Sequence, residues 1–347
     1  MSTIETPIGN VAASSIDDWE SVLHYMQPIM DLYTQEGVTD ILIHAYNDIK
    51  VVKGSQLIRV SNAFASEIDL VTFIGQVANA LGQNVGDDHP ILEARFPDTS
   101  RLQCTLSKVS PRGATVTIRL PPKEVLSFGK LIEYGALTVD MVDFIREHIE
   151  QEDNFLVSGN TGSGKTSFLR ACAEFVNPDA VLITAEDTQE LYLRQMLPNS
   201  VALESPRRRV KDGVKAIELV DLIHAMLRMN PDYCWVGEIR EAKAASAWVQ
   251  IGNTGHTLTA STLHSNGPHD TVKRLQYLLS SSGMLSYDLA GFQVLGNTKM
   301  FIHAARNLRK YGRKITDICL SNGAELEPVF VYNESLGRHE YVGRKFF

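Results

Sequence analysis

Apolar residues recur with two different periods along the first third of the chain. In residues 17–34 and 66–81 they return every third or fourth position, which predicts two amphipathic helices. Shorter runs, bounded by turn-forming residues, predict β-strands. These strands are expected at residues 40–44, 49–53, 56–60, 101–106 and 115–120. Together the helices and strands predict an α+β domain over residues 1–120.

The rest of the chain has another rhythm, in which apolar strand candidates alternate with helices. Strands are predicted at residues 154–158, 180–185, 233–237 and 257–263, and helices at 166–175, 218–229, 241–251 and 270–280. This alternation is typical of a mostly parallel sheet with helices on both faces, so an α/β domain is predicted over residues 137–347. Pro121 and Pro122 end the last strand of the first domain, because proline cannot donate to a β-ladder. We interpret residues 121–136 as the linker.

Composition narrows the class of protein. Hydrophobic residues are 44% and charged residues 21%, which is typical of a globular chain and not of a disordered one. The formal net charge of -8 argues against strong direct binding of nucleic acid. The four cysteines include no C-x-x-C pair, which argues against a cysteine zinc site and a disulfide framework. With no signal-peptide pattern at the N-terminus, a soluble cytoplasmic protein is expected.

Candidate chemistry begins with GNTGSGKT at residues 159–166, which matches the pattern G-x-x-x-x-G-K-[ST]. Glycines let successive backbone N–H groups turn toward phosphate oxygens, and the N-terminus of the following helix adds its dipole. The Lys165 side chain can reach the β- and γ-phosphates, and the Thr166 hydroxyl can ligate Mg²⁺. The expected ligand is ATP with Mg²⁺. The predicted nucleotide-binding residues are Gly159, Asn160, Thr161, Gly162, Ser163, Gly164, Lys165, Thr166 and Ser167.

Hydrolysis also requires an acid near the metal and a group that positions water. Glu186 directly follows the predicted strand 180–185, and Glu238 directly follows 233–237. Carboxylates at the C-terminal ends of parallel strands lie where ligands bind in α/β sheets. The alternative for each is a helix N-cap or a first-turn acid. His264 ends the last predicted strand and could sense the γ-phosphate, although a structural role is commoner for a single histidine.

Four segments then occur in an order that resembles the secretion traffic ATPases. They are GNTGSGKT from residue 159, ITAEDTQEL from 183, LRMNPDYCWVGEIR from 227 and GNTGHTLTASTLHSN from 252. They look like the Walker A, Asp, Walker B and His boxes of a superfamily that includes the VirB-type ATPases of type IV secretion and conjugation, CpaF, PilT-like pilus motors and GspE-like ATPases. Residues 90–122 also resemble the VirB-type N-terminal domain. The tetracysteine zinc insertion of GspE-like ATPases is missing from this sequence, which counts against that branch.

The resemblance implies a RecA-like P-loop ATPase domain and a smaller α+β domain, assembled as a homohexameric ring with nucleotide held between the two domains of a subunit. Glu186 matches the Asp-box glutamate that polarises the attacking water. Glu238 matches the Walker B glutamate, which contacts the metal through water, and His264 matches the histidine that links nucleotide state to domain position. Arg101 and Arg119 match N-terminal arginines that reach the phosphates.

The function implied is ATP hydrolysis that powers substrate translocation or pilus biogenesis in a type IV secretion (conjugation) system. Implied partners are inner-membrane components of the secretion complex, including another ATPase and the coupling protein, and a secreted protein or nucleoprotein substrate. The implied location is the cytoplasmic face of the inner membrane. Three alternatives stay open: a type IV pilus motor of the PilT or CpaF kind, a nucleotide-gated docking scaffold with little hydrolysis, and a DNA-translocating ATPase.

Two basic clusters are left without a role. The cluster that begins at Arg207 could face the nucleotide of a neighbouring subunit, and the cluster that begins at Arg306 could approach a membrane or a partner. A solvated surface is favoured for both. They consist of Arg207, Arg208, Arg209 and Lys211, and of Arg306, Arg309, Lys310, Arg313 and Lys314.

Overall fold

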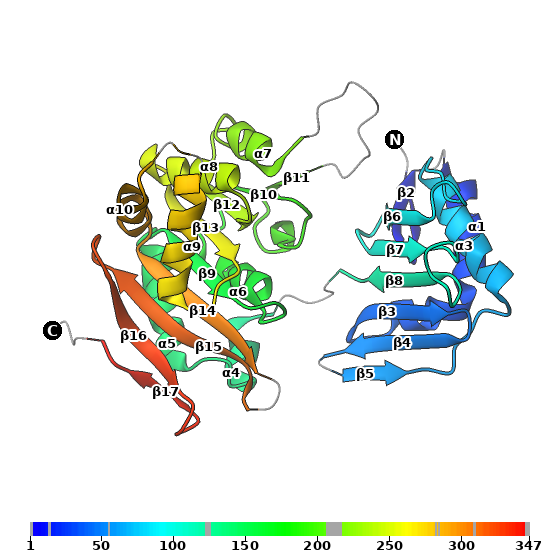
Figure 1. Cartoon of the computed structure of the whole chain (residues 1–347), viewed down its shortest axis with the longest axis horizontal. Coiled ribbons are helices and arrows are strands. Elements are labelled where there is room, and N and C mark those ends of the chain that lie inside the picture. Colours follow the sequence, from blue (N-terminus) through cyan, green and yellow to red (C-terminus); the bar gives the residue numbers. More distant parts are fainter. Residues whose placement is uncertain are drawn as a thin grey trace. The chain divides into compact units, whose positions relative to one another are not determined.

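Buried apolar side chains gather into separate cores in two units of the chain, Met1–Glu124 and Val125–Phe347. The computed structural model describes residues 3–343 apart from 13–14, 55, 122–125, 206–216, 282, 284 and 308–309. Figure 1 labels most of the helices and strands of both units. Within the described ranges, no helix is both long enough and apolar enough to cross a bilayer.

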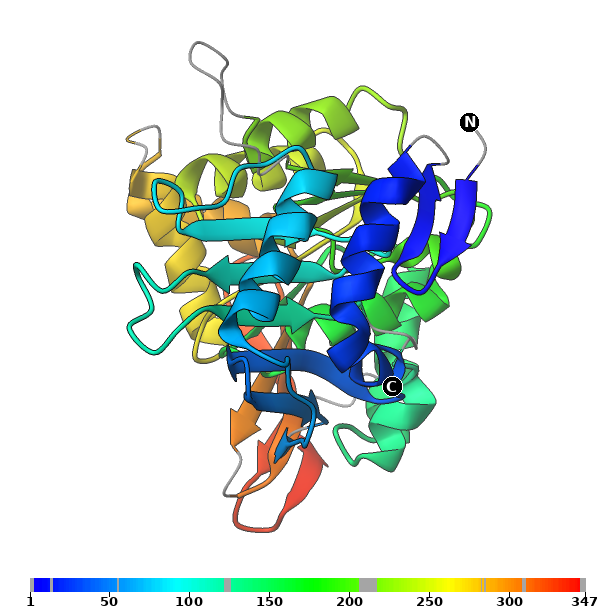
Figure 2. The same cartoon turned by 90° about the vertical axis from the view of Figure 1, so that its right-hand side faces the viewer.

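The first unit is built on six antiparallel strands in the order β5-β4-β3-β8-β7-β6. Helices α1 (Ile16–Met26) and α3 (Glu67–Ala80) lie across one face of this sheet, as Figure 2 shows. A hairpin of β1 (Thr3–Thr6) and β2 (Gly9–Ala12) precedes them. The six strands are β3 (Val38–Ala45), β4 (Asp48–Lys53), β5 (Gln56–Arg59), β6 (Ile91–Arg95), β7 (Arg101–Thr105) and β8 (Thr115–Arg119).

The side chains of this sheet alternate between its two faces. Ile41 and Ile43 of β3 and Ile118 of β8 are fully buried, and they share a core with Phe73 of α3. Because successive strand residues point to opposite faces, their neighbours lie on the face away from the helices. The core therefore occupies one side of the sheet.

One predicted helix of this unit is interrupted. The helix expected over residues 17–34 consists of α1, a 3₁₀ turn at Gln27–Ile29 and α2 (Met30–Thr34). Pro28 lies in the turn, and its ring removes a backbone donor and crowds the preceding turn of an α-helix. The apolar spacing is continuous through this region, but the α-helix is not.

A nine-stranded mixed sheet forms the second unit, in the order β11-β10-β12-β13-β9-β14-β15-β16-β17. The strands from β11 to β14 in this order are parallel, and β15 to β17 are added antiparallel at one edge. They are β9 (Phe155–Gly159), β10 (Leu182–Glu186), β11 (Val201–Glu204), β12 (Tyr233–Glu238), β13 (Thr257–Leu263), β14 (Met300–Asn307), β15 (Gly312–Ser321), β16 (Leu326–Asn333) and β17 (Arg338–Tyr341).

Helices cover both faces of this sheet. Phe155 and Val157 of β9 belong to one core with α4, α5 and α6, whereas Leu156 between them belongs to another with α7, α8, α9 and α10. Since alternate residues of a strand point to opposite faces, the two cores lie on opposite sides of the sheet. The helices are α4 (Phe128–Glu133), α5 (Val139–Glu150), α6 (Lys165–Cys172), α7 (Leu219–Met226), α8 (Ala242–Asn253), α9 (Pro268–Ser281) and α10 (Tyr287–Asn297).

Part of the stretch that we interpreted as a linker is helical. Helix α4 lies inside residues 121–136, and Phe128 and Leu131 of this helix are buried in the core of the second unit. The Phe128 ring stacks on Phe175, with centroids 4.8 Å apart. Residues from Phe128 onward therefore pack with the second unit.

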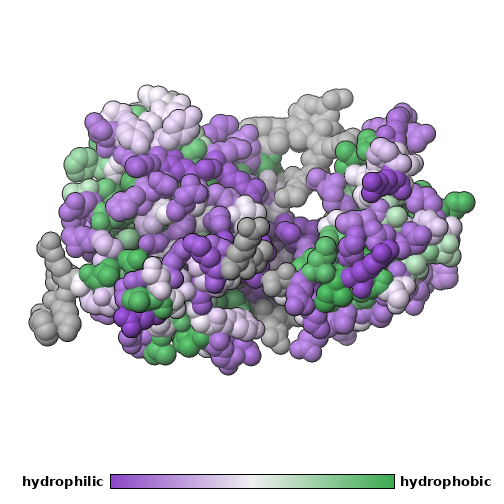
Figure 3. All heavy atoms as spheres, turned by 60° about the horizontal axis from the view of Figure 1, so that its bottom comes forward, coloured by the Kyte–Doolittle hydropathy of each residue, from purple (hydrophilic) through white to green (hydrophobic). Residues whose placement is uncertain are grey.

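The surface is mostly polar on the face drawn in Figure 3, where hydrophobic residues form small separate groups. Among the large apolar side chains that are exposed are Tyr277 and Phe292, on α9 and α10. Exposed apolar residues are common on protein surfaces.

Candidate functional site

The glycine-rich loop connects the end of β9 to the start of α6. A Cβ atom at Gly159 would lie 2.0 Å from the Ala304 carbonyl oxygen, so no larger residue fits beside β14. At the other end of the loop Gly164 is the N-cap of α6, and no side chain caps the helix. Its first backbone N–H groups are thus available to an anion, as a phosphate-binding loop requires.

Internal hydrogen bonds shape the loop. The Ser163 amide donates to the Asn160 carbonyl at 3.2 Å. The Asn160 side chain pairs with the backbone of Arg306, accepting from its N–H at 3.2 Å and donating to its carbonyl at 3.4 Å. The predicted binding residues differ in exposure: Gly159, Ser163 and Lys165 are buried, Gly164 and Thr166 are half-buried, and Asn160, Thr161, Gly162 and Ser167 are exposed.

A row of charged groups runs from the loop to the ends of β12 and β13. Lys165 is buried, and its Nζ lies 3.3 Å from the Asn160 carbonyl oxygen and 3.3 Å from His264 Nδ1. His264 Nε2 lies 3.1 Å from Glu238 Oε1. The other oxygen, Glu238 Oε2, accepts from Arg240 Nη2 at 2.7 Å. The structure therefore brings Lys165, His264 and Glu238 together.

The electrostatics of this row suit an anion site. Burial lowers the pKa of Lys165, and the Glu238 carboxylate opposes this effect. An ammonium that donates to His264 Nδ1 requires the imidazole proton to be on Nε2, facing Glu238. In the described part of the chain, Glu238 Oε1 is buried, and His264 Nε2 approaches it to 3.1 Å without the alignment of a hydrogen bond. A buried acceptor of this kind is suited to a bound water.

Glu186 is held more tightly than the sequence suggested. Its side chain is only 2% exposed at the end of β10, and Oε1 accepts from the Thr184 hydroxyl at 3.1 Å. Oε2 accepts from the backbone N–H groups of Glu190 at 2.8 Å and Leu191 at 3.1 Å. Burial raises the pKa of Glu186 to about 7, although these hydrogen bonds lower it. Glu186 thus fixes the segment that follows β10, and lies on the strand next to Glu238.

Arg101 and Arg119 belong to the first unit. They are direct cross-strand partners on β7 and β8. Arg119 Nε also donates to Asp40 Oδ1 at 3.0 Å across β3 and β8. The two arginines therefore form a cationic pair on the sheet of that unit.

The residues present fit a nucleotide with Mg²⁺. The described residues include no group of three or more His, Cys, Asp or Glu side chains that could hold a metal ion. In P-loop proteins the phosphates themselves supply metal ligands, and the protein adds a hydroxyl and a carboxylate. The Thr166 hydroxyl and Glu238 Oε1, which accepts no hydrogen bond from the described residues, are the candidates.

Several polar residues at this site were not predicted. Arg240 comes two residues after Glu238, and that spacing was the only signal for its ion pair. Arg306 and Arg313 lie against the loop, where Arg313 Nε donates to the Gly162 carbonyl at 2.9 Å. Arg313 is nevertheless exposed and Arg306 is half-buried, so both arginines keep contact with solvent while they touch the loop. Arg309 and the cluster at residues 207–211 lie outside the described residues.

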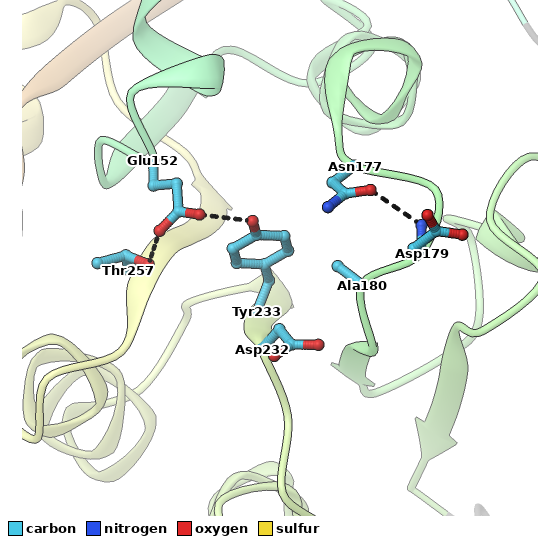
Figure 4. A pocket seen from close by; sticks show the side chains of 7 residues that line it. All are labelled: Glu152, Asn177, Asp179, Ala180, Asp232, Tyr233 and Thr257. Atoms are coloured by element: carbon cyan, nitrogen blue, oxygen red, sulfur yellow. Dashed lines mark hydrogen bonds between the residues drawn. The ribbon is translucent and has the colours of Figure 1, made fainter.

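A cavity of about 380 Å³ lies at the opposite edge of the parallel strands, where they begin (Figure 4). The Glu152 carboxylate accepts from the Tyr233 hydroxyl at 2.8 Å and from the Thr257 hydroxyl at 2.6 Å. Asp179, Asp232, Asn177 and Ala180 complete the lining. Because the candidate phosphate loop follows the C-terminal end of β9, this acidic cavity is separate from it.

Comparison with known proteins identifies the family. The model of the type II/IV secretion system protein family matches residues 22–296. The chain belongs to this family. It is similar to a putative conjugal transfer protein of Mycobacterium tuberculosis, with 28% identity over 314 residues that cover 88% of each chain. Similarity to the type IV secretion system protein VirB11 of Bartonella henselae is 25% over 297 residues, covering 75% of this chain and 82% of the relative.

The fold of this secretion family member also resembles that of solved structures. The pilus retraction motor PilT with bound ADP matches with a TM-score of 0.60 and 17% identity, covering 87% of this chain and 83% of the motor. At this level of identity the likeness concerns the fold alone.

Proposed function

We propose that this chain is an ATPase that powers substrate translocation or pilus biogenesis in a type IV secretion (conjugation) system. The observation that carries the proposal is the row Lys165, His264 and Glu238 beside the glycine-rich loop, with 3.3 and 3.1 Å between their facing atoms. These groups supply a phosphate-binding cation, an imidazole and a carboxylate at one edge of a parallel sheet. Membership in the secretion family supports the same reading.

The proposed reaction is attack of water on the γ-phosphorus of ATP. The amide groups at the start of α6 and the Lys165 ammonium would bind the phosphates, and Thr166 and Glu238 would hold Mg²⁺, directly or through water. Bound Mg²⁺ would neutralise charge that develops on the phosphate oxygens. His264 would part from Lys165 when the ammonium turns to a phosphate, so its position would report the nucleotide state.

Two carboxylates are candidates for orienting the attacking water. Glu238 Oε1 has no hydrogen-bond partner and lies beside His264, which favours direct contact with water. Both oxygens of Glu186 are already engaged, which favours a role in holding the segment after β10. We therefore assign the water to Glu238 first, and keep Glu186 as the alternative that the family resemblance implies.

The assembly and the cellular setting are also proposals. We propose a homohexameric ring, bound peripherally at the cytoplasmic face of the inner membrane, whose partners include other secretion-complex components. A ring requires a heterologous interface that closes on itself. Arg101 and Arg119 are proposed to contact the phosphates, because guanidinium groups stabilise the charge of a transferring phosphoryl group.

Lys165→Ala tests the site. Phosphate release should fall to the uncatalysed background, and the affinity for ATP should fall at least tenfold, because the buried cation is lost. Lys243→Ala is the matched control, since this lysine is exposed and pairs with Glu218 on the surface. Full turnover by Lys165→Ala would refute the assignment of the site.

Steady-state turnover of the wild-type protein separates the alternatives. A docking scaffold would bind ATP with no phosphate release above background, and a DNA-translocating ATPase would bind DNA with an affinity that falls as salt rises. A pilus motor shares the chemistry, so its partners in a pull-down would distinguish it.

A further inference from the structure

Two arginines flank the candidate phosphate loop from a hairpin that lies more than a hundred residues further along the chain. Strand β14 pairs in parallel with β9 up to the pair Ala304 and Gly159, and then continues beside the loop. Arg306 follows on β14, and Arg313 is its direct partner on the antiparallel strand β15. Ala304 belongs to the core that α6 covers, so Arg306, two residues on, lies on the same face of the sheet as α6.

Arg313 binds the backbone of the loop. Its Nε donates to the Gly162 carbonyl at 2.9 Å. The peptide that begins at this carbonyl also carries the Ser163 N–H, which closes the turn onto the Asn160 carbonyl. A planar trans peptide directs its C=O and N–H to opposite sides, so holding one end fixes the other. Arg313 therefore stabilises the shape of the loop without needing contact with a ligand.

Arg306 approaches the same loop residue. Its Nη1 is 2.8 Å from the position that a Cβ atom of Gly162 would occupy, and Gly162 has a φ of +72°. Only glycine suits this position, since a side chain would meet the guanidinium and a strained backbone. The Asn160 side chain holds the backbone of Arg306 in place by two hydrogen bonds.

The charges of this arginine pair are not balanced within the described residues. Neither guanidinium forms an ion pair there, and the Nε of Arg306 is buried without a hydrogen-bond acceptor. Desolvation, and then the Arg306 charge, lowers the pKa of Arg313. Like charges directly opposite each other in a sheet are destabilising. An anion bound at the loop would relieve this repulsion and supply the missing acceptor.

We propose that Arg306 binds the phosphates of a nucleotide that is held in the loop of its own subunit, and that Arg313 is a positioning residue for this loop. The inference rests on the proposed nucleotide site. It adds to that site a second source of positive charge, which comes from β14 and β15, whereas Lys165 belongs to α6. The ligand class is a nucleoside di- or triphosphate, recognised through its phosphates.

The test compares Arg306→Gln, Arg306→Lys and the control Lys310→Gln in the full-length protein. Lys310 carries the same charge on the same hairpin, but it is exposed and pairs with Glu334 at 2.5 Å. Dissociation constants for ADP and for pyrophosphate are measured by calorimetry at low and high salt. Because a charge-assisted hydrogen bond is lost, both dissociation constants should rise by about tenfold or more for Arg306→Gln. We expect Arg306→Lys to recover part of the affinity and Lys310→Gln to match the wild type.

Stability without ligand distinguishes a ligand-binding arginine from a structural one. Removing one of two facing cations relieves repulsion, so Arg306→Gln should have a melting temperature equal to or above that of the wild type. A lower melting temperature together with an unchanged affinity for ADP would overturn the proposal. Loss of affinity for ADP with unchanged affinity for pyrophosphate would overturn the assignment to the phosphates.

A separate set of measurements tests the positioning role of Arg313. Arg313→Lys keeps the charge but loses the Nε–H group that binds Gly162. For a positioning role we expect the KM for ATP to rise about fivefold, hydrogen exchange at the Ser163 amide to accelerate, and the melting temperature to stay within a degree or two. Recovery of wild-type exchange and KM by lysine would overturn this role. If the wild-type protein binds neither ADP nor pyrophosphate, the proposed function itself fails; if it binds both and the Arg306 variants do too, only this inference fails.

Discussion

Glu186 carries a carboxyl group whose protonation should change near neutral pH. Burial raises its pKa from the ordinary value of 4.5 to about 7. If the carboxylate orients the attacking water, kcat should rise as the pH increases through about 7 and then level off. Measuring kcat from pH 5.5 to 9 checks this, with Glu36→Gln, an exposed carboxylate of the first unit, as the control. A flat profile in the wild type would leave Glu238 as the water-orienting group.

The same shift predicts how stability depends on pH. Because the folded-state pKa lies above 4.5, the folded protein holds this proton more tightly than the unfolded chain. The stabilisation is complete below about pH 4.5 and is lost as the pH rises through about 7. The full effect is roughly 3 kcal/mol. Glu186→Gln should therefore lose less stability than the wild type between pH 5 and 8 in urea titrations. An identical loss in both would contradict the burial of the carboxyl.

Individual residues of the site differ in how far sequence could predict them. The sequence predicted Lys165 in the loop after β9 and Glu238 next to β12, and the structure has them there, because the end of a strand fixes where the next side chains lie. The engagement of both Glu186 oxygens by the loop after β10 was not predictable, since it depends on how that loop folds back. Arg306 gave no signal beyond a basic run, because its position depends on pairing with a strand far away in sequence.

Three segments of the chain meet at the acidic cavity, and two hydrogen bonds connect them. Tyr233 begins β12, Thr257 begins β13, and Glu152 precedes β9 and accepts from both. Tyr233→Phe should lower the free energy of unfolding by about 1 kcal/mol, because one hydrogen bond to a charged acceptor is lost. Glu152→Ala should cost more, since two hydroxyl groups lose their acceptor.

A double-mutant cycle with urea denaturation checks this prediction. The double variant should be less destabilised than the sum of the two single variants, because Tyr233 and Glu152 share one interaction. ATP turnover should be unchanged in all three, because the cavity is at the strand edge opposite the loop. Additive losses would mean that the two groups do not interact in solution.

At the scale of elements, local pattern predicted the alternating part of the second unit well. The predicted strand 257–263 and β13 (Thr257–Leu263) coincide, and the predicted strand 233–237 matches β12 to within one residue. Strands β14 to β17 were not predicted. Their place at the sheet edge comes from long-range pairing, which no local period encodes. Helix α5 (Val139–Glu150) has clear amphipathic spacing and was overlooked.

For the whole molecule, Arg101 and Arg119 test whether the first unit takes part in the chemistry. Arg101→Ala should lower kcat by about a hundredfold, because a guanidinium that stabilises the transferring phosphoryl group is worth several kcal/mol. Arg59→Ala is the matched control, since Arg59 is an exposed arginine of the same sheet, 3.4 Å from Asp48. Wild-type kcat in Arg101→Ala, measured by phosphate release, would restrict the chemistry to the second unit.

The proposed ring can be tested by its mass and by the activity of rings that contain both active and inactive chains. Light scattering should give a mass about six times the 38.5 kDa of one chain. When wild-type and Lys165→Ala chains are co-assembled in equal amounts, independent subunits would retain about half of the wild-type activity. If each subunit also needs two active neighbours, about one eighth should remain. Co-assembly with Lys243→Ala, which changes an exposed surface pair, should leave full activity. A linear fall of activity with the fraction of inactive chains would mean that the subunits hydrolyse ATP independently, whatever the mass of the assembly.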